Sequence, residues 1–313
     1  MPTPASLHVT RIETAIRTGQ AARSSVAASW ARSATLHRLD PGASRVDIRL
    51  TASELAMARE RTGALLPTAG PHLDRLFQTV GALGACIVLA DAEGVALDRR
   101  GNPGDDGDFD AAGLWTGTAW SEACAGTNGI GTCLVEGRQV TIHRDQHFLA
   151  RNIGLSCSSA PVFGPDGELI AVIDVSTARP DLPEAVSGLI GATVGDAARR
   201  VEADLFGQQF RTARLVLVPG TDRGSGAVLA VDTHDLVIGA TRAARQHLGL
   251  SGDLFASPRP LSDVLGQDGT DGFDDAERAV IARALARTSG NVSAAARALG
   301  LSRATLHRKL DRH

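Results

Sequence analysis

Hydrophobic and polar positions along this chain follow two different periods. From Pro71 onward, short apolar runs bounded by turn residues predict a helix followed by buried strands. The predicted strands are Ala85–Ala90, Val95–Arg99, Gln139–His143, Cys157–Phe163 and Leu169–Ser176. The Pro165–Gly167 turn joins the last two as a hairpin. Antiparallel strands with helical connections predict an α+β domain over residues 71–180.

A long helix is predicted next, within residues 181–213, where apolar residues recur at three- and four-residue steps. Pro183 fits its first turn. One apolar stripe runs along it, formed by Val186, Leu189, Ile190, Val194, Ala197, Val201 and Leu205. Such a stripe packs either within the chain or against the same helix of a second copy. We favour the second arrangement, which predicts a homodimer.

Residues 1–70 are predicted to form a helical region that lacks a catalytic cluster. Thr51 and Glu54 have the spacing of a capping box, which starts a helix that we expect to run to Leu66. Val26 and Trp30 are four residues apart on another expected helix. This spacing favours packing of Trp30 onto another surface over a binding role.

Three short helices are predicted in residues 273–313. The first is capped by Asp274, the second spans Val292–Leu299 after the breaking sequence Ser289–Asn291, and the third spans Arg303–Leu310 after Ser302. Gly300 ends the second helix. We expect Ala304, Leu306 and Leu310 to pack inward. A short helix, a glycine turn and a second short helix form the outline of a helix-turn-helix.

Positive charge is concentrated in this last segment. Residues 274–313 contain eight Lys or Arg against four Asp or Glu, although the whole chain carries a net charge of −3. Basic charge gathered at one end of an acidic protein is typical of DNA binding. A solvated helical hairpin is the plainer interpretation of the charge alone, but the caps, the turn and the basic third helix together favour double-stranded DNA.

The segment GNVSAAARALGLSRATLHRKL closely resembles the helix-turn-helix of the Fis family, which also ends bacterial enhancer-binding activators. The resemblance implies that Ser302 and Arg303 read bases. It places further DNA-facing side chains at Thr305, His307, Arg308 and Lys309, and side chains near the phosphates at Asn291 and Ser293. His307 stands where a longer basic side chain is common in that family.

Composition excludes several enzyme classes. With 43% hydrophobic and 21% charged residues, the chain is an ordinary globular protein. Lys309 is its only lysine, and P-loop ATPases, kinases and Schiff-base enzymes all need one in their active site. We therefore expect none of these three activities. We also expect no other enzymatic activity and no bound cofactor or metal. The absence of a signal-peptide pattern and of long apolar runs predicts a cytoplasmic protein without membrane contact.

The stretch Trp120–Cys133 contains three glycines within six residues, and Thr127 or Asn128 can cap a short helix that ends near Gly137. Taken alone, a glycine cluster is weak evidence for a ligand site. Together, however, WSEACAGTNGIGTC, VTIHRDQHF and LSCSSAPVFGPDGELIAVIDVS resemble the GAF domain of regulators of the acetoin-catabolism activator family. This resemblance covers about residues 20–210.

The GAF resemblance implies a domain that senses a small-molecule effector. The ligand-binding candidates that follow from it are Trp120, Glu122, Thr127, Asn128 and Cys157. In that family an AAA+ ATPase usually follows the sensory region, and this sequence contains no such segment. The chain is therefore expected to regulate transcription in a ligand-responsive manner, with RNA polymerase or a full-length activator as a further partner.

The rest of the chain is connecting structure. Residues 214–265 resemble the opening of a PAS domain, too short for a complete pocket, and residues 266–272 read as a flexible linker. The polar stretch Gly101–Gly113 is predicted to be a solvated loop, because its aspartates lack the spacing of a calcium site.

Two alternatives involve the cysteines, which we expect to be thiols in the cytoplasm. A thiol reductase of the GAF type would use Cys124, Cys133 and Cys157, but no CxxC pair supports it. A haem, metal or thiol redox sensor would use His143, His147, Cys124 and Cys157. Burial of Cys157 in an apolar strand is favoured over both.

Overall fold

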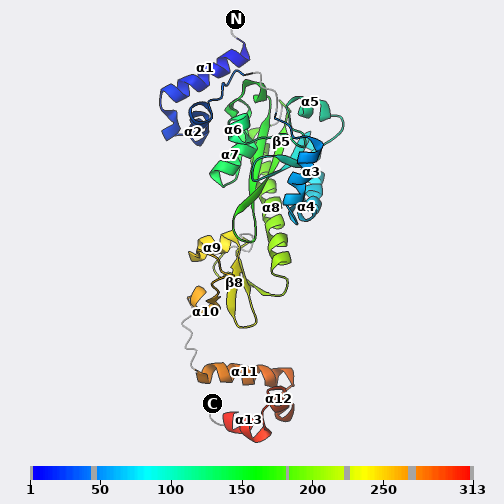
Figure 1. Ribbon diagram of the computed structural model, residues 1–313, viewed down its shortest axis with the longest axis vertical. Coiled ribbons are helices and arrows are strands. Elements are labelled where there is room, and N and C mark those ends of the chain that lie inside the picture. The colour runs from blue at the N-terminus through cyan, green and yellow to red at the C-terminus, as the bar shows by residue number, and fades with distance from the viewer. Residues whose placement is uncertain (1–2, 44–47, 181–182, 222–225, 267–272, 311–313) are drawn as a thin grey trace. The chain divides into compact units, whose positions relative to one another are not determined.

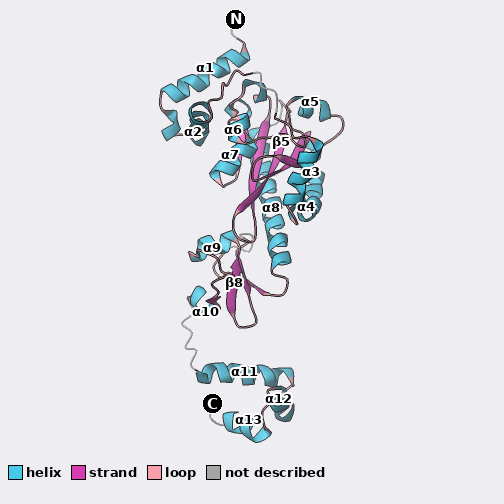
Figure 2. Cartoon of the chain, in the orientation of Figure 1, coloured by secondary structure: helices cyan, strands magenta, loops and turns pink. Residues whose placement is uncertain are grey.

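The computed structural model describes residues 3–43, 48–180, 183–221, 226–266 and 273–310 (Figure 1). The chain divides into two compact units, Met1–Pro258 and Arg259–His313. The α+β expectation is confirmed: the first unit is built on antiparallel strands with helices around them, and the second consists mainly of helices (Figure 2).

A five-stranded antiparallel sheet forms the centre of the first unit, in the order β2-β1-β5-β4-β3. Its strands are β1 (Ala85–Asp91), β2 (Ala96–Arg100), β3 (Val140–His143), β4 (Ser156–Phe163) and β5 (Leu169–Thr177). Each bound lies within one residue of the corresponding prediction. The hairpin between β4 and β5 places the two longest strands beside each other in the sheet.

Helices α4 (Leu65–Val80) and α8 (Glu184–Gln209) cover one face of this sheet (Figure 1). Because side chains alternate along a strand, Ile87 and Leu89 of β1 pack against these helices while Val88 and Ala90 pack against the other face. That second face is covered by the helices α5 (Asp106–Ala111), α6 (Glu122–Ala125) and α7 (Gly129–Glu136) and by the loop around Trp120.

The apolar stripe predicted on α8 packs largely within the chain. Ile190, Val194, Val201 and Leu205 are buried against the sheet and α4, whereas Leu189 is 68% exposed. The intrachain interpretation therefore accounts for most of the stripe, and the proposed homodimer has to rest on another surface of the chain.

The N-terminal region consists of α1 (Pro4–Arg17), α2 (Ser25–Ala31), a π-helical turn (Arg32–Leu36) and α3 (Ala52–Arg61). The Thr51 capping box is present. The helix that it starts ends at Arg61 instead of Leu66, because Gly63 turns the chain with a φ of +53° before α4 begins at Leu65. Trp30 is buried with Ile12, Phe148 and Leu149, as expected for a side chain that packs onto another surface.

The polar stretch Gly101–Gly113 contains a short helix, α5 (Asp106–Ala111), so the loop prediction is wrong there. Phe109 of this helix is 1% exposed and packs in the apolar cluster on the second face of the sheet, while Asp106 pairs with Arg99 at 2.6 Å.

Residues after α8 form a second, smaller antiparallel sheet from β6 (Arg214–Leu217), β7 (Val228–Val231) and β8 (Leu236–Ala240), followed by α9 (Arg242–Leu248). The second unit contains β9 (Arg259–Pro260), α10 (Leu261–Val264), α11 (Phe273–Arg287), α12 (Val292–Ala298) and α13 (Arg303–Leu310). The predicted linker, apart from Gly266, falls outside the described residues.

Candidate DNA-binding surface and sensory site

A small apolar core holds α11, α12 and α13 together. Ile281 and Ala284 of α11 pack against Ala295 and Ala296 of α12 and against Leu306 of α13. Because the α12 residues at this contact are alanines, little side-chain volume separates the helices. Two leucines of the third helix reach this core: Leu306 is 0% exposed, and Leu310 is partly buried against it as expected.

The turn between α12 and α13 has the predicted chemistry. Gly300 adopts a φ of +64°, and Leu301 N–H donates to the carbonyl of Ala296 at 2.8 Å. Ser302 Oγ accepts from Thr305 N–H at 3.1 Å, which caps α13. Asn291 caps α12 in the same way through Ala294 N–H, at 3.1 Å. The expected cap by Asp274 concerns a side chain outside the described part of the module.

The polar side chains of α13 lie on the outside of this core. Arg303, His307 and Arg308 are exposed, as are Asn291, Ser293 and Ser302. Thr305 is half-buried. The expectation that Ala304 packs inward is wrong, because Ala304 is exposed on the same surface. α13 thus offers one short, open and basic surface.

Lys309 differs from its basic neighbours. Its Nζ pairs with Glu277 Oε1 of α11, and both side chains are partly shielded from solvent. To contact a DNA phosphate, Lys309 has to break its ion pair with Glu277 or bind both groups at once.

In the sensory stretch, Asn128 caps α7 as predicted. Its Oδ1 accepts from Gly131 N–H at 2.9 Å, and its Nδ2 donates to the carbonyls of Trp120 at 2.9 Å and Gly126 at 2.8 Å. Asn128 is 1% exposed, so its whole amide is used to shape the loop. Gly137 ends the helix with a φ of +59°.

Glu122 is buried at 2% exposure and is held by the N-terminal region. Arg32 donates to both of its carboxylate oxygens at 2.9 Å, and Ser29 Oγ donates to Oε1 at 2.5 Å. Since the Ser29 hydroxyl proton is committed to Glu122, the hydroxyl of Thr127 donates to Ser29 Oγ at 2.7 Å. The hydrogen bonds to Glu122 also raise the pKa of Arg32.

Ser29 and Arg32 were not among the sequence candidates, and no local motif marks them. They lie about ninety residues before the loop that they contact. Ser29 lies on α2, and Arg32 begins the π-helical turn that follows it.

Trp120 and Cys157 are also enclosed by the chain itself. The Trp120 indole N–H donates to the Gly113 carbonyl at 3.1 Å, and the ring packs in the apolar cluster that includes Ile130 and Cys133. The five ligand candidates therefore lie around one loop, each in contact with the protein's own groups.

Cys157 belongs to a buried polar cluster on β4 and β5. His147 Nδ1–H donates to the Arg144 carbonyl at 2.9 Å, which leaves its Nε2 as an acceptor 3.3 Å from the Cys157 thiol. Ser176 Oγ lies 3.0 Å from the same thiol, so two acceptors face its one proton. Burial raises the pKa of Cys157 well above its ordinary value and lowers the pKa of His147 to about 4. Burial also raises the pKa of Cys133 well above its ordinary value. Two of the three cysteines that the thiol alternatives would use are therefore poor nucleophiles, which disfavours those alternatives.

Asp174 lies beside Cys157 and accepts hydrogen bonds from Ser159 at 2.5 Å and Ser176 at 2.6 Å. Burial raises its pKa to about 6.

Among the described residues, no group of three His, Cys, Asp or Glu side chains could hold a metal ion. Within the same residues, no helix is both long enough and apolar enough to cross a membrane.

Two family models match the chain. The model described as "MimR, N-terminal domain" matches residues 6–188, and the model described as "Bacterial regulatory protein, Fis family" matches residues 272–313. The first covers the N-terminal helices together with the five-stranded sheet, in keeping with the contacts between α2 and the sensory loop.

Similar proteins are transcriptional regulators. The acetoin catabolism regulatory protein of Cupriavidus necator is 32% identical over 243 residues, which cover 76% of this chain and 36% of that protein. The propane 2-monooxygenase operon transcriptional activator MimR of Mycolicibacterium smegmatis is 32% identical over 163 residues, which cover 50% of this chain and 26% of that protein. The chain therefore spans between about a quarter and about a third of the length of these relatives.

A solved structure shares the fold. A chain of the Escherichia coli DhaR(N)–DhaL complex superposes with a TM-score of 0.53 at 21% sequence identity, covering 76% of this chain and 81% of that chain.

Proposed function

This chain belongs to the family of the MimR N-terminal domain, and on that basis we propose that it is a DNA-binding transcriptional regulator controlled by a small molecule. The observation that carries the proposal is the surface of α13. Arg303, His307 and Arg308 are exposed there, while Leu306 fixes the helix to its core. A short basic helix presented in this way fits the major groove of double-stranded DNA.

A homodimer is part of the proposal. One three-helix module contacts few phosphates, whereas two modules on half-sites about 34 Å apart bind with combined affinity. The activity requires access to DNA, which supports a cytoplasmic location. RNA polymerase or a full-length activator is the proposed further partner.

Selection from a random DNA pool tests the proposal. We expect the full chain to enrich one sequence arranged as an inverted repeat, and to bind it with an affinity that falls steeply as salt rises. Retention of DNA without enrichment of any sequence would contradict a sequence-specific regulator. Enrichment of a single half-site would contradict the dimer.

The 313-residue chain is also expected to hydrolyse no ATP, since Lys309 is its only lysine and lies on α13. Phosphate release by the purified chain should equal that of a buffer blank. Turnover above that level would show a nucleotide site that these residues do not suggest.

A further inference from the structure

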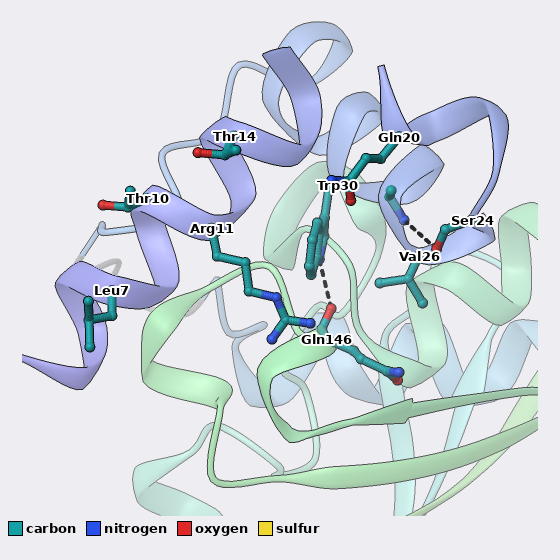
Figure 3. A pocket seen from close by; sticks show the side chains of 10 residues that line it. Leu7, Thr10, Arg11, Thr14, Gln20, Ser24, Val26, Trp30 and Gln146 are labelled. Atoms are coloured by element: carbon teal, nitrogen blue, oxygen red, sulfur yellow. Dashed lines mark hydrogen bonds between the residues drawn. The ribbon is translucent and has the colours of Figure 1, made fainter. Parts of the chain in front are cut away.

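A cleft of about 500 Å³ opens between α1, α2 and the turn Arg144–Gln146 (Figure 3). The Trp30 ring stands between Arg11 and Val26 in this view, and Leu7 and Val26 add aliphatic surface to the lining. The polar groups of the lining are hydroxyls and amides, contributed by Thr10, Thr14, Gln20, Ser24 and Gln146.

The charge of the cleft indicates what it can hold. Arg11 is the only charged side chain in its lining, and it is paired with Asp145. The carboxylate of Asp145 already balances the charge of Arg11, so a ligand carboxylate or phosphate would meet both charges. An apolar wall with hydroxyl and amide groups instead suits an uncharged molecule with an apolar skeleton and hydroxyl or carbonyl groups.

Helix α2 connects this cleft to the sensory loop. Ala27 and Trp30 line the cleft, while Ser29 and Arg32 from the other side of the same segment hold Glu122. A ligand that shifts Trp30 therefore acts on a helix whose next residues bind the loop. Trp30 is itself fixed by its indole N–H, which donates to the Gln146 carbonyl at 2.8 Å.

Phe148 provides a second connection. It is buried in the same apolar cluster as Trp30, and its backbone N–H donates to the Thr127 carbonyl at 3.0 Å. Its ring fills the space beside Gly126, where an added Cβ would lie 2.6 Å from the ring. The cleft is therefore connected to the loop around Thr127 by direct contacts, through α2 and through Phe148.

We infer that this cleft between α1 and α2 receives the small molecule, and that α2 transmits its binding to Glu122 and Thr127. The inference rests on the proposed regulatory function and assigns its ligand site and ligand class. The residues of the Trp120–Cys133 loop then respond to ligand binding through α2 and do not contact the ligand themselves.

The three tryptophans allow a direct test, because Trp30 lines the cleft, Trp120 lies in the loop and Trp115, outside the cleft lining, stacks against Arg99. In the full chain labelled with 5-fluorotryptophan, titration with cyclohexanol, cyclohexanone or 1,4-butanediol should shift the fluorine resonances of Trp30 and Trp120 along one saturation curve. The Trp115 resonance should stay in place. Cyclohexanecarboxylate, which adds a negative charge to a similar shape, should bind at least about tenfold more weakly.

Variants locate the site and the connection. Thr14→Phe fills the cleft and should raise Kd by about tenfold or more, whereas Glu13→Phe, one residue earlier at an exposed position outside the lining, should leave it unchanged. Ser29→Ala should keep the Trp30 shift and reduce the Trp120 shift.

Three results would overturn the inference: no Trp30 response to any of the uncharged probes, an unchanged Kd in Thr14→Phe, or an unchanged Trp120 shift in Ser29→Ala. Equal binding of the carboxylate would overturn the ligand class. Each of these would leave sequence-specific DNA binding by the wild type intact, so failure of this inference is distinct from failure of the proposed function.

Discussion

The third helix of the DNA module and the loop before α7 both carry a run of polar residues, yet they use them in opposite ways. On α13, Arg303 and Arg308 project from an alanine-rich core into solvent. In the loop, Glu122, Thr127 and Asn128 are enclosed and bound to groups of the same chain. A polar motif can therefore mark either a surface that is free to bind a partner or an interior whose polar groups must form hydrogen bonds within the fold.

The physical reason is the cost of burial. A buried polar group without a hydrogen bond is costly, so every polar atom of the loop has to find a partner within the fold. An exposed arginine is solvated with or without its DNA. Changes in the loop should consequently act on stability, and changes on α13 should act on binding.

The largest effect is expected for Glu122→Ala. The change removes the buried carboxylate that Arg32 and Ser29 share and leaves Arg32 with Glu136 alone, which should lower the free energy of unfolding by about 3 kcal/mol. All three tryptophans lie in the first unit, so their fluorescence during urea unfolding reports that unit alone. The exposed Glu93→Ala should change stability by less than about 0.5 kcal/mol. Equal urea midpoints for Glu122→Ala and Glu93→Ala would contradict the contrast between the buried loop and the exposed surface.

A second test uses pH and Asp174, whose pKa is about 6 in the folded protein against 3.8 ordinarily. Because the folded state holds this proton more tightly than the unfolded state, the contribution of Asp174 to stability falls as pH rises from about 4 to about 6 and is constant above that. Asp174→Asn removes this dependence.

The stability of the wild type relative to Asp174→Asn should therefore decrease by roughly 2 kcal/mol between pH 4 and pH 7. Urea unfolding of both proteins at each pH measures the difference, and the other carboxyl groups cancel in the comparison. A difference that stays constant with pH would place Asp174 in a solvated environment.

The same contrast explains what the sequence could predict. Local patterns placed the strands, the caps Thr51, Asn128 and Ser302, and the helices of the DNA module, because each depends on neighbouring residues. The partners of Glu122 could not be predicted in this way, since Ser29 comes from a helix far away in the sequence. Phe109 was missed for a related reason: the polar composition around it concealed a single buried anchor.

On the DNA side, Arg303→Ala should cost about 1–3 kcal/mol at the selected site and relax the base preference there. Fluorescence anisotropy with the selected duplex and with a scrambled duplex measures both effects. Because Arg303 is exposed and outside the core, thermal unfolding should be unchanged. If specific binding survives the substitution, α13 does not read bases through this residue.

The smallest effects are expected at Lys309, where the two kinds of polar residue meet on one helix. Lys309→Ala should weaken binding to all sequences alike and reduce the slope of log affinity against log salt by about one unit, as for the loss of one phosphate contact.

The pairing of Lys309 with Glu277 opposes that phosphate contact in the free protein. Glu277→Gln should therefore tighten binding by about two- to fivefold, the range for a partly exposed ion pair. In the double variant that combines Lys309→Ala with Glu277→Gln, the gain in affinity should vanish if Glu277 acts through Lys309. The gain should persist if the Glu277 carboxylate merely repels DNA. A salt slope that is unchanged in Lys309→Ala would mean that Lys309 stays with Glu277 on DNA and belongs to the packed interior of the module.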